Sequence, residues 1–211
     1  MYENILLDLD GTLSDNSKGI FKGVIKALEY FNIDYCESDL NSFIGPPLLD
    51  SFMIKYNMDK TSALKAVEVY REYYSVDGLF ENTLYDGVEK VLSVLKERGK
   101  KLYLTTAKPQ VFAEKIMIHF GVDHYFDGIY GATLDTSRIH KEDIIKYVIM
   151  NNKLEKRVTI MVGDRYHDIE GADVNGIDSV GVTYGFGSRD ELLASGADFV
   201  IDDIAALPEI L

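Results

Sequence analysis

From about Asp86 onward, short apolar runs alternate with segments of helical periodicity. The runs expected as strands are Lys101–Thr105, Gly128–Tyr130, Val158–Val162, Ser179–Val182 and Phe199–Ile201. The segments expected as helices are Gly87–Arg98, Pro109–Phe120, Lys141–Asn151, Asp168–Asn175, Arg189–Ala194 and Ile204–Leu211. This alternation predicts an α/β fold, a parallel sheet with helices on both faces. The amino-terminal run Ile5–Leu7 adds one more strand, and Ser188 with Glu191 three residues later fits a capping box.

Residues 16–82 have a different pattern, with apolar residues at helical spacing and no convincing strand. We therefore expect an inserted helical module at 16–82, and a main domain made of residues 1–15 and 83–211. The two connecting segments, near Thr12–Ser17 and Phe80–Asp86, are expected to lie close together and to act as a hinge.

An Asp-Leu-Asp-Gly-Thr motif at residues 8–12 directly follows the amino-terminal apolar run. Side chains two apart on an extended backbone point the same way, so Asp8 and Asp10 are expected to face one spot. Two such carboxylates repel each other unless a cation neutralises them or one holds a proton. Gly11 permits a tight bend, and Thr12 adds a hydroxyl. The motif therefore indicates a metal site or acid–base chemistry.

Two further polar clusters each follow an expected strand. Thr105-Thr106-Ala107-Lys108 follows one strand, and the run from Gly163 to Asp168 follows another. Ligands of open parallel sheets bind outside the carboxyl ends of the strands, so these clusters and the 8–12 motif are expected at one edge. Lys141 opens a helix and can reach the same edge.

Phosphoryl transfer explains this set of residue types. A phosphoryl group in transfer carries charge on three oxygens and needs cations and donors around it. Asp8 can attack phosphorus, because carboxylates form covalent aspartyl phosphates. Asp10 can protonate the leaving oxygen and then activate water. The Thr106 hydroxyl and the Lys141 ammonium can hold the phosphoryl oxygens.

A divalent metal completes this chemistry. Asp164 and Asp168 add carboxylates for Mg²⁺, which prefers oxygen ligands together with substrate phosphate and water. The metal would also let the anionic Asp8 approach an anionic substrate. We therefore expect Mg²⁺ as the cofactor.

With these motifs in order, the chain resembles the haloacid dehalogenase superfamily, in its phosphatase branches. The matching motifs are DxDGT at Asp8–Thr12, Thr106 after the second motif strand, the lone Lys141, and GDxxxD at Gly163–Asp168. The resemblance covers the whole chain and implies a Rossmann-like catalytic core with an α-helical cap at 16–82. It implies that Asp8 is the nucleophile and that Asp10 is the general acid and base.

The same resemblance implies the metal ligands. These are Asp8, the backbone carbonyl of Asp10, and Asp164, with Asp168 in support. Thr105 is an alternative to Thr106 for the phosphate hydroxyl, but the alignment through Lys108-Pro109 favours Thr106.

Finer features resemble the 5′-nucleotidase-like and phosphoglycolate phosphatase-like group. They are Ile44–Leu48, Tyr70–Tyr74, Thr106–Pro109 and Tyr184–Ser188. Related proteins often have Asn or Ser where this chain has Ala107. The residues expected to contact substrate are Gly11, Thr12, Gly45, Pro46, Arg71, Thr106, Ala107 and Lys108.

Composition and charge limit the classes of molecule that this chain is expected to bind. The formal net charge of −13 argues against a basic nucleic-acid-binding face. The amino-terminal residues do not resemble a signal peptide, and no segment has the apolar length of a membrane helix, so a cytoplasmic protein without a membrane partner is expected. The single cysteine, Cys36, is expected to be a small, buried or half-buried residue. The chain is expected to be a monomer or weak homodimer that acts on a small phosphorylated metabolite.

These observations favour a Mg²⁺-dependent phosphatase that hydrolyses a small phosphate monoester through an aspartyl phosphate, with a 5′-nucleotidase first. The alternatives are a phosphoglycolate or sugar-phosphate phosphatase, or a phosphomutase or other phosphotransferase with the same nucleophile. A dehalogenase would not need Asp10 or the acidic metal cluster. A non-catalytic binding module would be expected to lack the nucleophile or a metal ligand, and this chain lacks neither.

Overall fold

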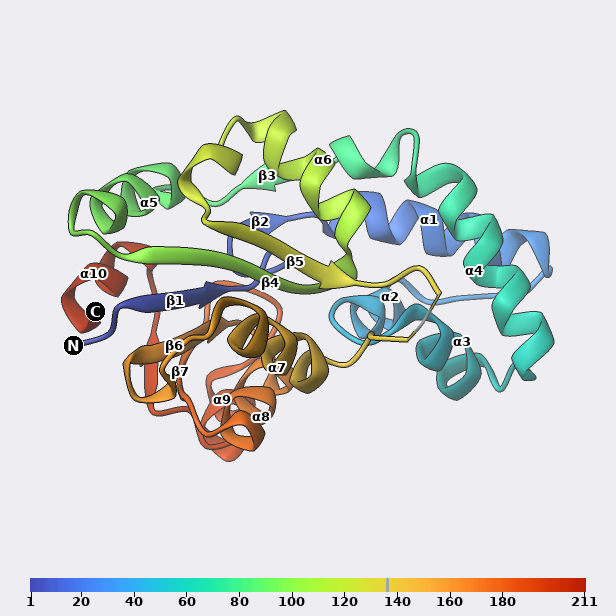
Figure 1. Ribbon diagram of the computed structural model, residues 1–211. Coiled ribbons are helices and arrows are strands. Elements are labelled where there is room, and N and C mark those ends of the chain that lie inside the picture. The colour runs from blue at the N-terminus through green and yellow to red at the C-terminus, as the bar shows by residue number, and fades with distance from the viewer. Residues whose placement is uncertain (136) are drawn as a thin grey trace. The chain divides into compact units, whose positions relative to one another are not determined.

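The computed structural model describes residues 1–135 and 137–211 (Figure 1). The chain divides into two compact units, one formed by Met1–Asp15 with Leu84–Leu211 and the other by Asn16–Thr83. None of the helices in the described residues is both long enough and apolar enough to span a membrane.

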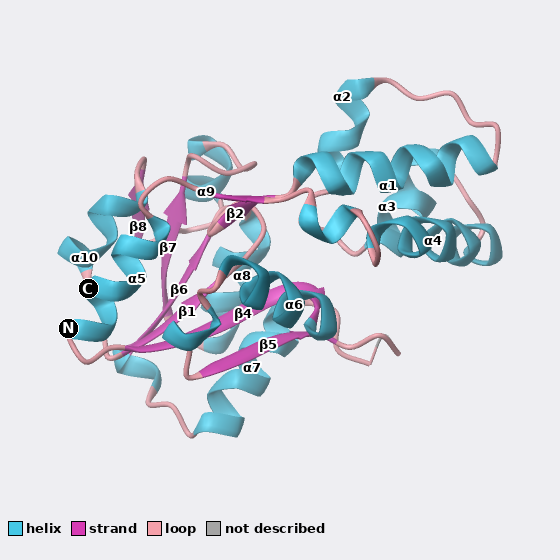
Figure 2. Cartoon of the chain, turned by 90° about the horizontal axis from the view of Figure 1, so that it is seen from above, coloured by secondary structure: helices cyan, strands magenta, loops and turns pink. Residues whose placement is uncertain are grey.

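The first unit contains a parallel sheet whose six strands, within the described residues, run in the order β5-β4-β1-β6-β7-β8. The strands are β1 (Asn4–Leu7), β4 (Lys101–Pro109), β5 (Gly128–Ala132), β6 (Thr159–Gly163), β7 (Asp178–Val182) and β8 (Phe199–Ile201). Figure 2 shows them side by side. The predicted parallel α/β sheet is confirmed.

Helices cover both faces of this sheet, with α5 and α6 on one side and α7 and α8 on the other (Figure 1). The helices of this unit are α5 (Val88–Glu97), α6 (Gln110–Phe120), α7 (Lys141–Asn152), α8 (Tyr166–Asn175), α9 (Arg189–Ala194) and α10 (Leu207–Ile210). Helix α8 begins two residues before the predicted start, because the turn after β6 is short.

The burial of β1 is consistent with its place inside the sheet, between β4 and β6. All four of its residues are buried, which is typical of a strand covered on both faces. Leu6 lies beside Tyr103 of β4 and Met161 of β6, and these side chains form one face of the sheet. That face packs against Ile145, Val148 and Ile149 of α7 and Ala172 of α8. Because β1, β4 and β6 are in register, the segments that follow them emerge at the same edge.

The Asn16–Thr83 unit is helical. Its elements are α1 (Ser17–Tyr30), α2 (Glu37–Leu40), the 3-10 turn Asn41–Phe43, α3 (Leu48–Tyr56), α4 (Lys60–Tyr74) and the 3-10 turn Gly78–Phe80. Tyr70 and Tyr74 stack with ring centroids 5.0 Å apart and are buried, and Phe43 packs edge-on against Phe52. The prediction for Cys36 was wrong: its side chain is exposed, because it lies in the extended turn that precedes α2.

Two short strands mark where the chain passes between the units. β2 (Ser14–Asp15) and β3 (Thr83–Leu84) form a two-stranded sheet of their own. The connecting segments of the chain are therefore paired with each other.

Candidate active site

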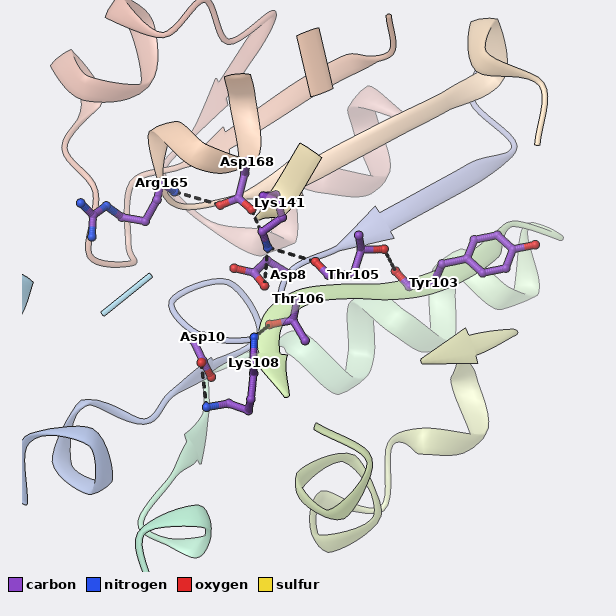
Figure 3. A network of polar contacts seen from close by, with 9 residues as sticks. All are labelled: Asp8, Asp10, Tyr103, Thr105, Thr106, Lys108, Lys141, Arg165 and Asp168. Atoms are coloured by element: carbon purple, nitrogen blue, oxygen red, sulfur yellow. Dashed lines mark hydrogen bonds and ion pairs between the residues drawn. The ribbon is translucent and has the colours of Figure 1, made fainter. Parts of the chain in front are cut away.

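Lys141, at the first position of α7, is the centre of the polar network at the carboxyl edge of the sheet (Figure 3). Its Nζ lies 2.8 Å from Asp8 Oδ1 and 2.8 Å from Asp168 Oδ1. It also donates a hydrogen bond of 3.0 Å to the carbonyl oxygen of Thr105. An ammonium group has three N–H donors, so these three acceptors use all of them. Lys141 therefore links β4 to the segments that follow β1 and β6.

Three buried carboxylates gather beside this lysine. Asp8, Asp164 and Asp168 each offer an oxygen, and these oxygens all lie within 4.8 Å of one another. Asp164 Oδ2 accepts a hydrogen bond of 2.8 Å from the backbone N–H of Phe186. Asp164 Oδ1 is buried and has no hydrogen-bond partner among the described residues. A buried carboxylate oxygen without a donor is costly unless a cation occupies the space beside it.

The crowding of negative charge is visible in the pKa values. Burial, and then the charges of Asp168 and Asp8, raise the pKa of Asp164 well above its ordinary value. Burial also raises the pKa of Asp168, although Lys141 opposes the shift. Burial alone would lower the pKa of Lys141, but its two carboxylate partners outweigh burial and raise that pKa. The cluster thus has more negative than positive charge, which suits a divalent cation.

Asp10 has a different partner from Asp8. Its Oδ2 lies 2.8 Å from Nζ of Lys108, and its carboxylate lies outside the group formed by the other three aspartates. The backbone N–H of Lys108 donates a hydrogen bond of 3.2 Å to the hydroxyl oxygen of Thr106. The sequence predicted that Asp8 and Asp10 face one spot because the backbone is extended there. β1 ends at Leu7, however, so the motif leaves the extended conformation, and the two carboxylates pair with different lysines.

The bend after Asp10 brings the backbone against the acidic cluster. Gly11 has a φ of +81°, and a Cβ there would lie 2.1 Å from Asp164 Oδ2. Only glycine tolerates both this conformation and this approach. The side chain of Thr12 is fully buried, and its carbonyl oxygen accepts a hydrogen bond of 2.9 Å from the hydroxyl of Tyr184. Gly11 and Thr12 therefore fix the backbone that lies against the acidic cluster.

One residue of the network was missed at the sequence level. Glu191 Oε1 lies 2.8 Å from Nε of Arg165 and accepts a hydrogen bond of 3.0 Å from the backbone N–H of Tyr166. The backbone N–H of Arg165 in turn donates to Asp168 Oδ2 at 3.1 Å. Ser188 accepts from the backbone N–H of Glu191, as the predicted cap requires. The Ser-x-x-Glu pattern predicted only the cap of α9. It did not indicate that the Glu191 carboxylate also binds Arg165 and Tyr166, a set of contacts that we call the clamp on the 163–168 turn.

The remaining candidates are divided between the two units of the chain. Ala107 lies beside Thr106 and is half-buried. Gly45, Pro46 and Arg71 belong to the Asn16–Thr83 unit, where Gly45 is exposed and the other two are half-buried. Their contact with a substrate stays a prediction.

The fold and the site together define a class of protein: an α/β enzyme with acids and lysines at the carboxyl edge of its sheet. The chain matches the family model of haloacid dehalogenase-like hydrolases over residues 5–182. It belongs to this family of hydrolases, and the family resemblance seen in the sequence is confirmed.

Individual relatives are similar over the whole chain. A 5′-nucleotidase from Pseudomonas aeruginosa is 46% identical over 211 residues, covering 100% of this chain and 96% of that protein. Tyrosine-protein kinase PtkA from Mycobacterium tuberculosis is 34% identical over 207 residues, covering 98% of this chain and 70% of that protein. The crystal structure of a predicted phosphatase from Clostridium acetobutylicum superposes with a TM-score of 0.97 at 44% identity, covering 100% and 98% of the two chains.

Proposed function

We propose that this chain is a Mg²⁺-dependent phosphatase that hydrolyses nucleoside 5′-monophosphates through an aspartyl phosphate. The observation that carries the proposal is the juxtaposition of Asp8, Asp164 and Asp168 around Lys141. A buried nucleophilic carboxylate beside a cation and further acids is the arrangement that phosphoryl transfer to aspartate requires. The choice of nucleotides rests on the similarity to the Pseudomonas 5′-nucleotidase.

The donor set fits a divalent ion. The proposed ligands of the ion are Asp8, the backbone carbonyl of Asp10, and Asp164. Asp168 would support them, since its carboxylate is already bound by Lys141 and by the backbone N–H of Arg165. The unpartnered Asp164 Oδ1 is the atom best explained by such an ion. When bound, Mg²⁺ neutralises charge between the phosphoryl oxygens and the carboxylates.

The chain's own residues perform two steps. An oxygen of Asp8 attacks phosphorus while Asp10 gives a proton to the leaving oxygen, so the P–O ester bond breaks and an alcohol departs. Asp10, now a carboxylate, then takes a proton from water. That water attacks the aspartyl phosphate, which releases inorganic phosphate and restores Asp8. The Thr106 hydroxyl holds a phosphoryl oxygen. Lys141, whose three donors are taken by Asp8, Asp168 and the Thr105 carbonyl, holds the nucleophile in line rather than the phosphoryl oxygens expected from the sequence.

The helical unit at 16–82 would act as a cap that selects the leaving group. Gly45, Pro46 and Arg71 are its proposed substrate contacts. Arg71 offers a planar donor for an anionic or hydrogen-bonding group of the substrate. Whether Arg71 contacts an anionic or a neutral group, the proposed substrate is a small phosphorylated metabolite.

The experiment is a phosphate-release assay with purified protein and Mg²⁺. The panel comprises nucleoside 5′-monophosphates, phosphoglycolate, sugar phosphates and pyrophosphate. We expect the highest kcat/KM for a nucleoside 5′-monophosphate and no turnover in excess chelator. Full rates without divalent metal, or no phosphate from any ester, would contradict the proposal.

A second candidate is phosphoryl transfer to an acceptor other than water, favoured by the similarity to PtkA. It uses the same Asp8 but requires that water be excluded from the aspartyl phosphate. Product analysis separates the two. A phosphatase yields inorganic phosphate in equal amount to the alcohol product, whereas a transferase yields alcohol in excess over phosphate when a hydroxyl acceptor such as a tyrosine peptide is present.

A further inference from the structure

We propose that Lys108 is a positioning residue that holds the Asp10 carboxylate where it can exchange a proton with the leaving group. The inference rests on the proposed phosphatase function and deepens it. Nζ of Lys108 lies 2.8 Å from Asp10 Oδ2, and a dashed line in Figure 3 marks this ion pair. The two side chains are only 4% and 15% exposed, so water screens this ion pair weakly.

The local fold explains why Lys108 reaches Asp10. Regular pairing of β4 with β5 ends at Thr106, and the next paired residue on β4 is Pro109. Extra residues on one strand of a pair bend that strand and redirect its side chains. The backbone N–H of Lys108 bonds to the Thr106 hydroxyl, which fixes the bent segment. The irregularity therefore directs a lysine at the end of the strand toward the 8–12 motif.

The two acids of the motif are thereby assigned to different ammonium groups. Asp8 pairs with Lys141, whereas Asp10 pairs with Lys108. A carboxylate on a short side chain can rotate away from its neighbours, and a charge-assisted contact with a buried lysine prevents this. Without Lys108, repulsion by the nearby carboxylates favours rotation of Asp10 away from the reaction centre. Lys108 thus keeps the proton donor separate from the nucleophile.

This role has a chemical signature. Protonation of the leaving oxygen matters greatly when an alkoxide would depart, as from a nucleoside monophosphate. It matters little when the leaving group is 4-nitrophenolate, which is a weak base. A lysine that only bound the phosphate would affect both substrates equally, because both carry the same phosphoryl group.

The test compares kcat/KM, which reports the step that breaks the ester bond, for adenosine 5′-monophosphate and 4-nitrophenyl phosphate. Lys108→Met is expected to lower kcat/KM about 100-fold for the nucleotide, within the range of general acid catalysis. For 4-nitrophenyl phosphate the loss is expected to stay below about fivefold. Lys108→Arg should restore part of the nucleotide activity. The matched control is Lys115→Met, an exposed lysine on α6, which should match the wild type on both substrates.

A double variant distinguishes loss of the Lys108–Asp10 contact from general misfolding and gives a second measurement. In an Asp10→Asn background no charged carboxylate needs a partner, so adding Lys108→Met should cause no further loss of kcat/KM on either substrate. Equal losses on the two substrates, or additive losses in the double variant, would overturn the role of Lys108 while leaving the phosphatase intact. No phosphate release by the wild-type protein would instead overturn the proposed function and this inference together.

Discussion

The ammonium group of Lys141 and the carboxylate of Asp8 lie 2.8 Å apart, although residues 8 and 141 are far apart in sequence. Both side chains are almost entirely buried, at 4% and 11% exposure. An ion pair in such surroundings constrains the orientation of the proposed nucleophile. It also makes the surrounding fold depend on the charges of the site, so activity and stability can be tested on the same residues.

Replacing the nucleophile should abolish turnover without unfolding the protein. Asp8→Asn keeps the size of the side chain but cannot form an aspartyl phosphate. We expect kcat/KM for phosphate release to fall by at least about a thousandfold, on the scale seen when catalytic groups are removed. The protein should stay folded, because Lys141 keeps Asp168 as a charged partner and the repulsion between Asp8 and the other two carboxylates is removed. Asp173→Asn, an exposed change on α8, is the control. A folded Asp8→Asn protein with normal activity would exclude this nucleophile.

Removing the buried lysine should destabilise the first unit. Lys141→Met leaves Asp8 and Asp168 without their shared cation, and breaking a buried ion pair on one side costs about 3–5 kcal/mol. Urea unfolding of the metal-free protein measures this loss. Adding Asp168→Asn to Lys141→Met removes one unpaired charge and should recover part of the stability but no activity. A single variant as stable as the wild type would mean that the pair is energetically neutral.

The clamp on the 163–168 turn should tune metal binding. Glu191→Ala releases Arg165 and the backbone N–H of Tyr166, and loosening such a supporting contact typically weakens metal binding about 10-fold or more. Titration calorimetry with Mg²⁺ or Mn²⁺ measures the affinity directly, independent of turnover. The neighbouring, exposed Asp190→Ala is the matched control. Unchanged affinity in Glu191→Ala would show that the turn holds its shape without the clamp.

Gly11 should be intolerant of a methyl group, for two reasons that a comparison can separate. Gly11→Ala introduces both an unfavourable φ and a clash with Asp164, whereas Gly99 has a φ of +74° with nothing within 4 Å of the point where a Cβ would lie. We expect Gly99→Ala to cost about 1 kcal/mol of stability through backbone strain alone. Gly11→Ala should cost more and should also lose Mg²⁺ binding. Equal effects of the two substitutions on metal binding would contradict the close approach.

Magnesium should stabilise the protein more at neutral than at acidic pH. In the metal-free protein, burial raises the pKa of Asp168 to about 6 and also raises that of Asp164. The folded state then binds more protons than the unfolded state above about pH 4, so metal-free stability falls as pH rises through about 6. Mg²⁺ replaces those protons. The increase in thermal midpoint caused by Mg²⁺ should therefore be larger at about pH 7.5 than at about pH 5, and an equal increase would contradict the linkage.

The sheet and much of the acidic cluster were predictable because they depend on strand ends. Asp8 and Asp164 each directly follow a buried strand, and Thr106 lies in the last part of β4, which extends further than predicted. Parallel strands in register bring such positions to one edge. Lys141 was predicted to open a helix and to reach this edge, but its partners were not predicted, because no sequence rule specifies how far a lysine side chain reaches. Here it extends from the start of α7 to the residues after β1.

Other features depend on tertiary structure that local patterns do not encode. The pair between Lys108 and Asp10 arises from an irregularity in β4, which periodicity cannot reveal. Glu191 was interpreted as a capping residue, since its spacing from Ser188 is the same whether its carboxylate turns to the helix or to Arg165. Cys36 was expected to be buried or half-buried on residue type alone, but it lies exposed in the extended segment that precedes α2.

The central place of β1 constrains the order in which this protein can assemble on the ribosome. The strand is synthesised before its neighbours β4 and β6, which end at residues 109 and 163. Residues 16–83 are synthesised before these partners and contain their own buried apolar side chains. The helical unit can therefore fold on the nascent chain before β4 and β6 are available to complete the catalytic edge of the sheet.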